Sequence, residues 1–163
     1  MMKLLMALLL LISDSQSLVT DLRKHYALVG ANETHVNEVM NLSKNSHDPI
    51  AQAYAAGAEM ASAQYKFSPV SKLSVFQSGK AKLEKLVEAN RQNPEIRFIR
   101  YTIQLKCPAM LGYNKELKTD RTFLLGEMPG LRKNNPELYK YILSFMLLHD
   151  RLSEPERETL NLK

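Results

Sequence analysis

A polar strip within residues 94–105 (PEIRFIRYTIQL) carries side chains well suited to binding an anion. Arg97, Arg100 and Gln104 follow one another at the spacing that places side chains on one side of a helix. Planar guanidinium groups bind carboxylates or phosphates through paired hydrogen bonds. The strip therefore predicts a binding site for an anionic group, and the nearby Tyr113 and Asn114 complete the candidate set.

The same side chains have a structural alternative. Arginines on a helix that is covered by its neighbours often hold those neighbours in place by pairing with a carboxylate. Asp120, or carbonyl groups at a helix end, would supply the partners. From the sequence, the strip is either a binding site or such a pairing.

The helix that carries the strip has apolar residues on two sides. At about 100° per residue, Ile96 and Ile99 fall on one side while Phe98 and Tyr101 fall nearly opposite. This pattern predicts a helix that is buried on both sides, with the polar strip between them.

No other pattern indicates catalysis or a cofactor. The sequence contains neither a glycine-rich phosphate loop nor a G-x-S-x-G nucleophile motif, and its four histidines lack metal-ligand spacing. The single cysteine, Cys107, is typical of a small buried apolar residue. We therefore predict no catalytic residue, no metal and no cofactor, and we expect that the protein is not an enzyme.

The N-terminus has the layout of a secretory signal peptide. Lys3 precedes an uninterrupted apolar run over residues 4–12, and small polar residues follow as far as Ser17. The run is shorter than the roughly 20 residues that span a bilayer, so we expect no transmembrane helix in the mature chain. The sequence predicts a signal peptide over residues 1–17, one helical domain over 18–163, and a periplasmic or envelope location; a buried first helix is the alternative.

Helix starts recur along the chain. Asp48-Pro49, Asn93-Pro94 and Asn135-Pro136 each combine a capping side chain with a proline in the first turn, where its missing N–H costs nothing. Ser68-Pro69 has the same form. Sustained alternation of apolar and polar residues is missing. The fold class is therefore predicted to be all-α, with stacked antiparallel helical hairpins of the tetratricopeptide-like type.

Helix ends and turns are also predicted. Pro108 ends the helix that carries the strip, and Gly112 provides a turn. Asn114 is expected to cap the next helix, which runs to Leu125, and residues 128–130 (Met-Pro-Gly) are expected to form a loop.

Two resemblances support this architecture. Residues 79–100 resemble the junction between helices in tetratricopeptide-type repeats. Most of the chain resembles a group of small exported bacterial proteins with a tetratricopeptide-like helical domain. The likeness rests on Phe67-Ser68-Pro69, Lys72-Leu73, Phe76, Asn93 to Phe98, Arg100, Leu111 to Asn114, Asp120 and Phe123. Membership implies export and helical hairpins, and it implies no particular activity.

The charge distribution suggests two kinds of partner. The net charge is +5, and residues 66–106 hold nine basic against three acidic residues. The main hypothesis is a non-catalytic module that binds another protein or a peptide. The alternative is peripheral binding of an anionic surface, a membrane or a polyanion, through residues 66–106. A solvated helix surface would also explain the excess of basic residues. Export disfavours nucleic acid as a partner. The oligomeric state is left open.

Overall fold

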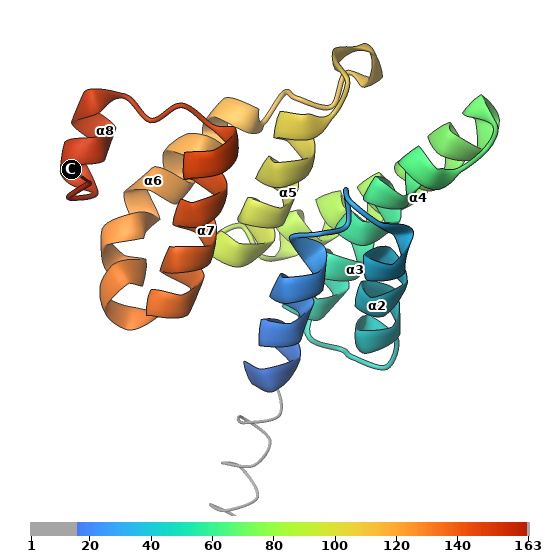
Figure 1. The fold of residues 1–163 in the computed structure, drawn as a ribbon, viewed down its shortest axis with the longest axis horizontal. Helices are drawn as coiled ribbons and strands as arrows, with labels where there is room; N and C mark the ends of the chain where they lie inside the picture. Colours follow the sequence, from blue (N-terminus) through green and yellow to red (C-terminus); the bar gives the residue numbers. More distant parts are fainter. Residues whose placement is uncertain (1–15, 163) are drawn as a thin grey trace, which may run out of the picture. The chain divides into compact units, whose positions relative to one another are not determined.

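Helices account for all the regular secondary structure of the part of the chain that the computed structural model describes, residues 16–162 (Figure 1). The chain is all-α, as the sequence predicts. The signal-peptide prediction lies almost entirely outside the described residues.

The elements follow one another through short connections. Residues 16–26 are helical. They are followed by α2 (Glu33–Ser43), α3 (Pro49–Ser62), the 3₁₀ turn η1 (Ala63–Tyr65), α4 (Pro69–Ala89), α5 (Pro94–Lys106), the 3₁₀ turn η2 (Ala109–Leu111), α6 (Leu117–Asn134), α7 (Pro136–His149) and α8 (Glu154–Thr159).

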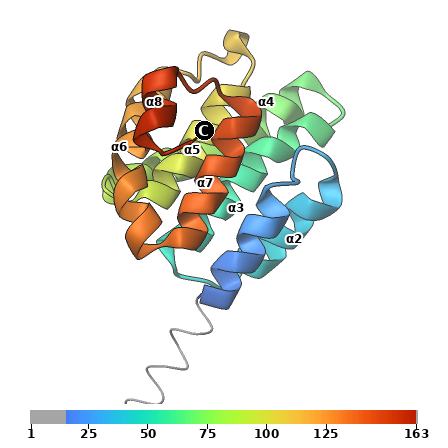
Figure 2. The same ribbon diagram turned by 60° about the vertical axis from the view of Figure 1, so that its left-hand side comes forward.

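The chain divides after Asn90 into two compact units. In the first unit, α3 packs against both α2 and α4. In the second unit, α6 packs against both α5 and α7, and Figure 2 shows α6 and α7 running alongside each other. The single domain over residues 18–163 stays a prediction.

The predicted helix starts are confirmed by their hydrogen bonds. Each capping side chain accepts a bond from a backbone N–H in the first turn, which satisfies a donor that has no partner within the helix. In α5 the Oδ1 of Asn93 accepts from the N–H groups of Glu95 and Ile96, at 3.0 and 3.1 Å. The capping residues of the predicted starts are Asp48, Ser68, Asn93 and Asn135, and Asn32 caps α2 in the same way.

At two places a local sequence pattern does not decide the structure. Thr20 and Asp21 have side chains that are typical of helix caps, but the first described helix is already formed at residue 16. The loop expected at residues 128–130 is helical, because α6 continues through Pro129 to Asn134. An interior proline costs about 3 kcal/mol, but the continuing helix buries Met128 and Leu131 in the core of the second unit. Tertiary burial outweighs the local preference.

The first unit is built around a close approach of α3 and α4. Gly79 of α4 is buried, and a Cβ atom built on it would lie 2.7 Å from the carbonyl oxygen of Ala56 and 2.9 Å from the backbone nitrogen of Met60. Distances this short do not occur for real Cβ atoms. Gly79 therefore permits a close approach of the two helix backbones that a larger residue would prevent.

We expect Gly79→Ala to destabilise the protein by about 1–3 kcal/mol, because the added methyl group overpacks the contact with α3. Alanine has the higher helix propensity by up to about 1 kcal/mol, so the packing cost must exceed that gain. Gly126→Ala is the matched control, since a Cβ atom at Gly126 of α6 meets nothing within 4 Å. Thermal unfolding should show a lower melting temperature for the first variant and an equal or higher one for the second. Two equally stable variants would contradict the tight packing.

The second unit has an aromatic core under α5. Phe98 makes edge-to-face contacts with Tyr141 and Phe145 of α7, each with ring centroids 5.3 Å apart. Tyr101 also contacts Phe145. Ile96 and Ile99, on the other side of α5, are fully buried as well. Both predicted apolar sides of α5 are therefore buried.

Candidate anion-binding site

The two arginines of the polar strip converge on one carboxylate. Arg97 donates from Nε to Oδ1 of Asp120 at 2.8 Å. Arg100 donates from Nε to Oδ2 at 2.7 Å and from Nη2 to Oδ1 at 2.9 Å, which is a bidentate pair. Asp120 lies in the first turn of α6 and is 0% exposed. The pairing that the structural alternative expects is present.

Gln104 completes this polar cluster. Its Nε2 donates to Oδ2 of Asp120 at 3.3 Å, and its Oε1 accepts from the backbone N–H of Glu116 at 3.0 Å. Glu116 is the N-cap residue of α6. A side chain from α5 therefore satisfies a backbone donor at the beginning of α6. The cap expected at Asn114 is wrong, because α6 begins at Leu117.

The five predicted binding residues differ in accessibility. Arg100, Gln104 and Tyr113 are buried, Arg97 is partly buried, and Asn114 is exposed. A ligand in solution can approach the cluster mainly at Arg97. Arg97 is also the one predicted residue that lines a hollow on the surface of the second unit.

That hollow, which we call the basic hollow, lies along the beginning of α6 and has a volume of about 590 Å³. Three of its lining side chains are cations and two carry hydroxyl groups; none is acidic. They are Arg97, Lys115, Lys118, Thr119, Thr122 and Phe123.

The wall of the basic hollow is held in place by Arg97. Its guanidinium carbon lies 3.9 Å from the centre of the Phe123 ring, a cation–π contact. Its Nη2 donates to the carbonyl oxygen of Thr119 at 3.3 Å. Lys115 and Lys118 are exposed beside it. The positive end of the α6 dipole also favours negative charge here, so the hollow suits an anionic group.

Of the residues that line the basic hollow, only Arg97 is predicted from the sequence to bind a ligand. Lys115 and Lys118 lie three residues apart, as do Thr119 and Thr122, so one side of the coming helix has basic and hydroxyl groups. This pattern in the sequence indicates a basic side of the helix. It does not predict that Arg97 lies beside that helix, because Arg97 and its contact Phe123 are far apart in the sequence.

A second charged network holds the C-terminal segment of this unit. Arg121 donates from Nε to Oδ2 of Asp150 at 2.7 Å, and from Nη1 and Nη2 to the two carboxylate oxygens of Glu156 at 2.6 and 3.0 Å. The hydroxyl group of Tyr101 donates to the same oxygen of Asp150 at 2.7 Å. Burial, and then the Asp150 carboxylate, raise the pKa of Tyr101 well above its usual value. The tyrosine therefore stays protonated, which suits a structural donor.

The network predicts a pH dependence of stability. The hydrogen bonds from Arg121 lower the pKa of Glu156 from 4.5 to about 2. A carboxyl group whose pKa is lower in the folded state stabilises that state above its unfolded pKa, and this stabilisation disappears as the pH falls towards the folded value. We expect the difference in unfolding free energy between the wild type and Glu156→Gln to shrink between pH 4.5 and 2. Urea unfolding across this range measures it; a constant difference would show that Glu156 is not ionically paired.

The histidines and the cysteine show little that resembles a metal or catalytic site. His25 and His35 do come together, with their Nδ1 atoms 3.1 Å apart, which their separation in the sequence hides. Across residues 16–162, groups of three or more histidine, cysteine or carboxylate side chains that could hold a metal ion are absent. Cys107, the one cysteine of the sequence, is partly buried.

The basic stretch over residues 66–106 contains cations that have acidic partners. It belongs to both units, since α4 precedes Asn90 and α5 follows it. Lys82 pairs with Glu59 at 2.6 Å, and Arg97 and Arg100 pair with Asp120. Among the described helices, none is both long and apolar enough to cross a membrane.

Comparisons of the chain with protein-family models, with curated proteins and with solved structures gave no match.

Proposed function

We propose that this protein is a non-catalytic binding module that takes up an acidic segment of a partner protein at the basic hollow. The observation that carries the proposal is the lining of the hollow, which contains three cations and no acidic side chain. Carboxylates of an extended peptide would lie against Lys115 and Lys118, while Arg97 forms the wall.

The proposal includes the architecture and location that the sequence predicts. Successive antiparallel helices, stacked as hairpins in the tetratricopeptide-like manner, present side chains of neighbouring helices to a bound peptide. Export would place this module in the periplasm or at the cell envelope, where its partner would be another envelope protein. Supporting the hairpin arrangement, α6 packs against the helices before and after it in the second unit.

The buried pairing and the open hollow have different roles in this proposal. Asp120 already neutralises charge on Arg97 and Arg100, so these arginines mainly position the wall. Lys115 and Lys118 are exposed and supply the attraction. Because exposed charges are screened by salt, we expect affinity to fall as the ionic strength rises.

The test is a titration with a short fluorescent peptide of glutamate and aspartate residues, followed by anisotropy. A neutral peptide of the same length is the ligand control. The double variant Lys115→Ser/Lys118→Ser should bind about tenfold more weakly, since two exposed ion pairs contribute about 1–2 kcal/mol.

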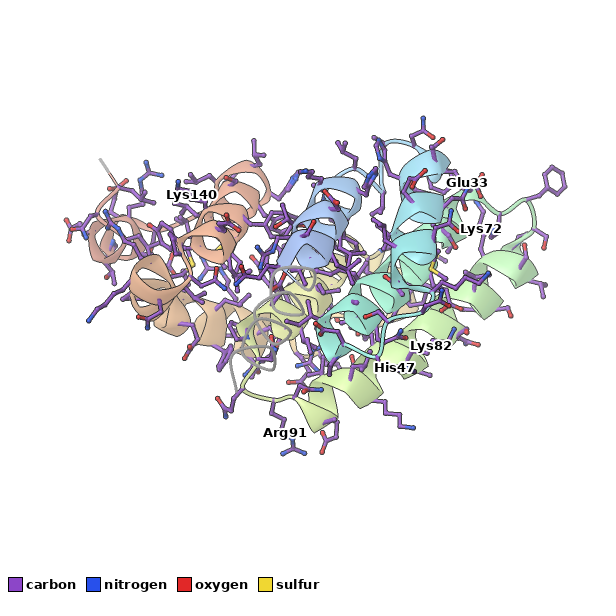
Figure 3. All side chains as sticks on the ribbon, turned by 90° about the horizontal axis from the view of Figure 1, so that it is seen from below. Glu33, His47, Lys72, Lys82, Arg91 and Lys140 are labelled. Atoms are coloured by element: carbon purple, nitrogen blue, oxygen red, sulfur yellow. The ribbon has the colours of Figure 1, made fainter. Side chains whose placement is uncertain are left out.

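Lys140→Ser is the matched control variant, because Lys140 is an exposed lysine of the same unit on α7 and does not line the hollow (Figure 3). Its affinity should equal that of the wild type. Equal affinities for all three proteins, or equal binding of the acidic and the neutral peptide, would refute the proposed site.

A further inference from the structure

The first unit exposes an apolar group where α4 begins. Phe67, just before the helix, is 103% exposed, and Val70 and Leu73 in its first two turns are 78% and 44% exposed. Val70 and Leu73 are three residues apart and so lie on one side of α4. We call these three residues, with Lys66 and Lys72, the α4 tip.

The tip is exposed because α4 is longer than the helix it packs on. With 21 residues against 14 in α3, α4 extends past its partner, and Figure 1 shows its first turns projecting beyond α2 and α3. The apolar side chains lie on a protrusion, whereas peptide grooves are concave. A protrusion of this kind is better suited to inserting into a deformable surface such as a lipid bilayer than to binding a small ligand.

Basic residues lie beside the apolar ones. Lys66 precedes Phe67 and Lys72 precedes Leu73, and residues 60–83 contain no acidic side chain. Lys66 has a long, exposed ion pair with Glu33 at 3.7 Å, which contributes little and is readily exchanged for another anion. Lys72, labelled near the beginning of α4 in Figure 3, has no ion-pair partner among the described residues.

We propose that the α4 tip inserts into the interface of an anionic lipid membrane. Phe67, Val70 and Leu73 would leave water for the boundary between headgroups and acyl chains, where exposed apolar side chains are stabilised. The ammonium groups of Lys66 and Lys72 would extend to the lipid phosphates. The sequence suggests binding of an anionic surface through residues 66–106, and the present proposal assigns that binding to the beginning of this stretch. The proposal does not depend on the basic hollow.

The chain offers a direct probe of insertion, because it contains no tryptophan. The variant Phe67→Trp therefore places one fluorophore at the tip of the full-length protein. With vesicles that contain phosphatidylglycerol, we expect its emission to shift to shorter wavelength and to be quenched by lipids with brominated acyl chains. Pure phosphatidylcholine vesicles should produce a much smaller change, and adding Lys72→Ser should weaken the response to the anionic vesicles.

Leu148→Trp is the matched control, because Leu148 is an exposed apolar residue of the second unit. Both variants carry the same residues 1–15. Binding to vesicles through that segment alone would therefore affect the emission of the two probes equally. Equal shifts of both probes, or no shift at position 67 with anionic vesicles, would overturn the proposal. Short-wavelength emission from the Phe67→Trp variant in the absence of vesicles would also overturn it, because the tip would then be covered by a second copy or by the chain itself. An equal response to neutral and anionic vesicles would overturn it as well.

Discussion

Ile142→Asp should destabilise the second unit by at least about 4 kcal/mol, because it buries a carboxyl group without a partner in an apolar core. Ile142 is 0% exposed and belongs to the cluster that joins α5, α6 and α7. An ionised carboxylate there loses its hydration, and a protonated one still lacks a hydrogen-bond partner. Urea unfolding followed by circular dichroism measures the effect, and a loss of folded protein on expression would agree with it.

Leu148→Asp provides the control within the same helix. Leu148 is an apolar residue of α7 like Ile142, but its side chain is 77% exposed. We expect this substitution to change the unfolding free energy by no more than about 0.5 kcal/mol. If the two variants were equally stable, or if Leu148→Asp were the more damaging, the orientation of α7 in this core would be wrong.

Asp120→Asn should cost about 3–5 kcal/mol, because it removes the charge that balances two arginines in a largely buried cluster. The amide has nearly the same shape as the carboxylate, so packing changes little. Arg97 and Arg100, whose side chains are 12% and 9% exposed, would then face a neutral group that also carries donors of its own. Thermal and urea unfolding at neutral pH are the measurements.

Glu127→Gln, on the same helix, is the control for Asp120→Asn. Glu127 is exposed, and it is outside both the Asp120 cluster and the basic hollow. We expect its unfolding free energy to match that of the wild type within about 0.5 kcal/mol. An Asp120→Asn protein as stable as the Glu127→Gln protein would mean that the arginines do not depend on Asp120.

Much of the helix pattern is predictable because helix starts are local. An Asn or Asp before a proline offers its oxygen to N–H groups two or three residues ahead, and Asp48, Asn93 and Asn135 do so. The turn at Gly112 is equally local, with a φ of 60° that glycine adopts without strain. Such features need no knowledge of the rest of the chain.

The candidate site was predictable only in part. The side of α5 that carries Arg97, Arg100 and Gln104 follows from helical spacing, and Asp120 was one of the partners considered. The choice of Asp120 depends on how α6 packs against α5. The contribution of Lys115 and Lys118 to an open surface depends on the same packing.

The sequence by itself determined the all-helical class, the capped beginnings of the helices and the two apolar sides of α5. Only the tertiary structure decided that α6 runs through Pro129, that Asp120 holds both arginines, and that a basic hollow lies beside them. The physical reason is range. Caps and helical periodicity act over a few residues, whereas burial of Met128 and pairing of Asp120 join segments that only the folded chain brings together.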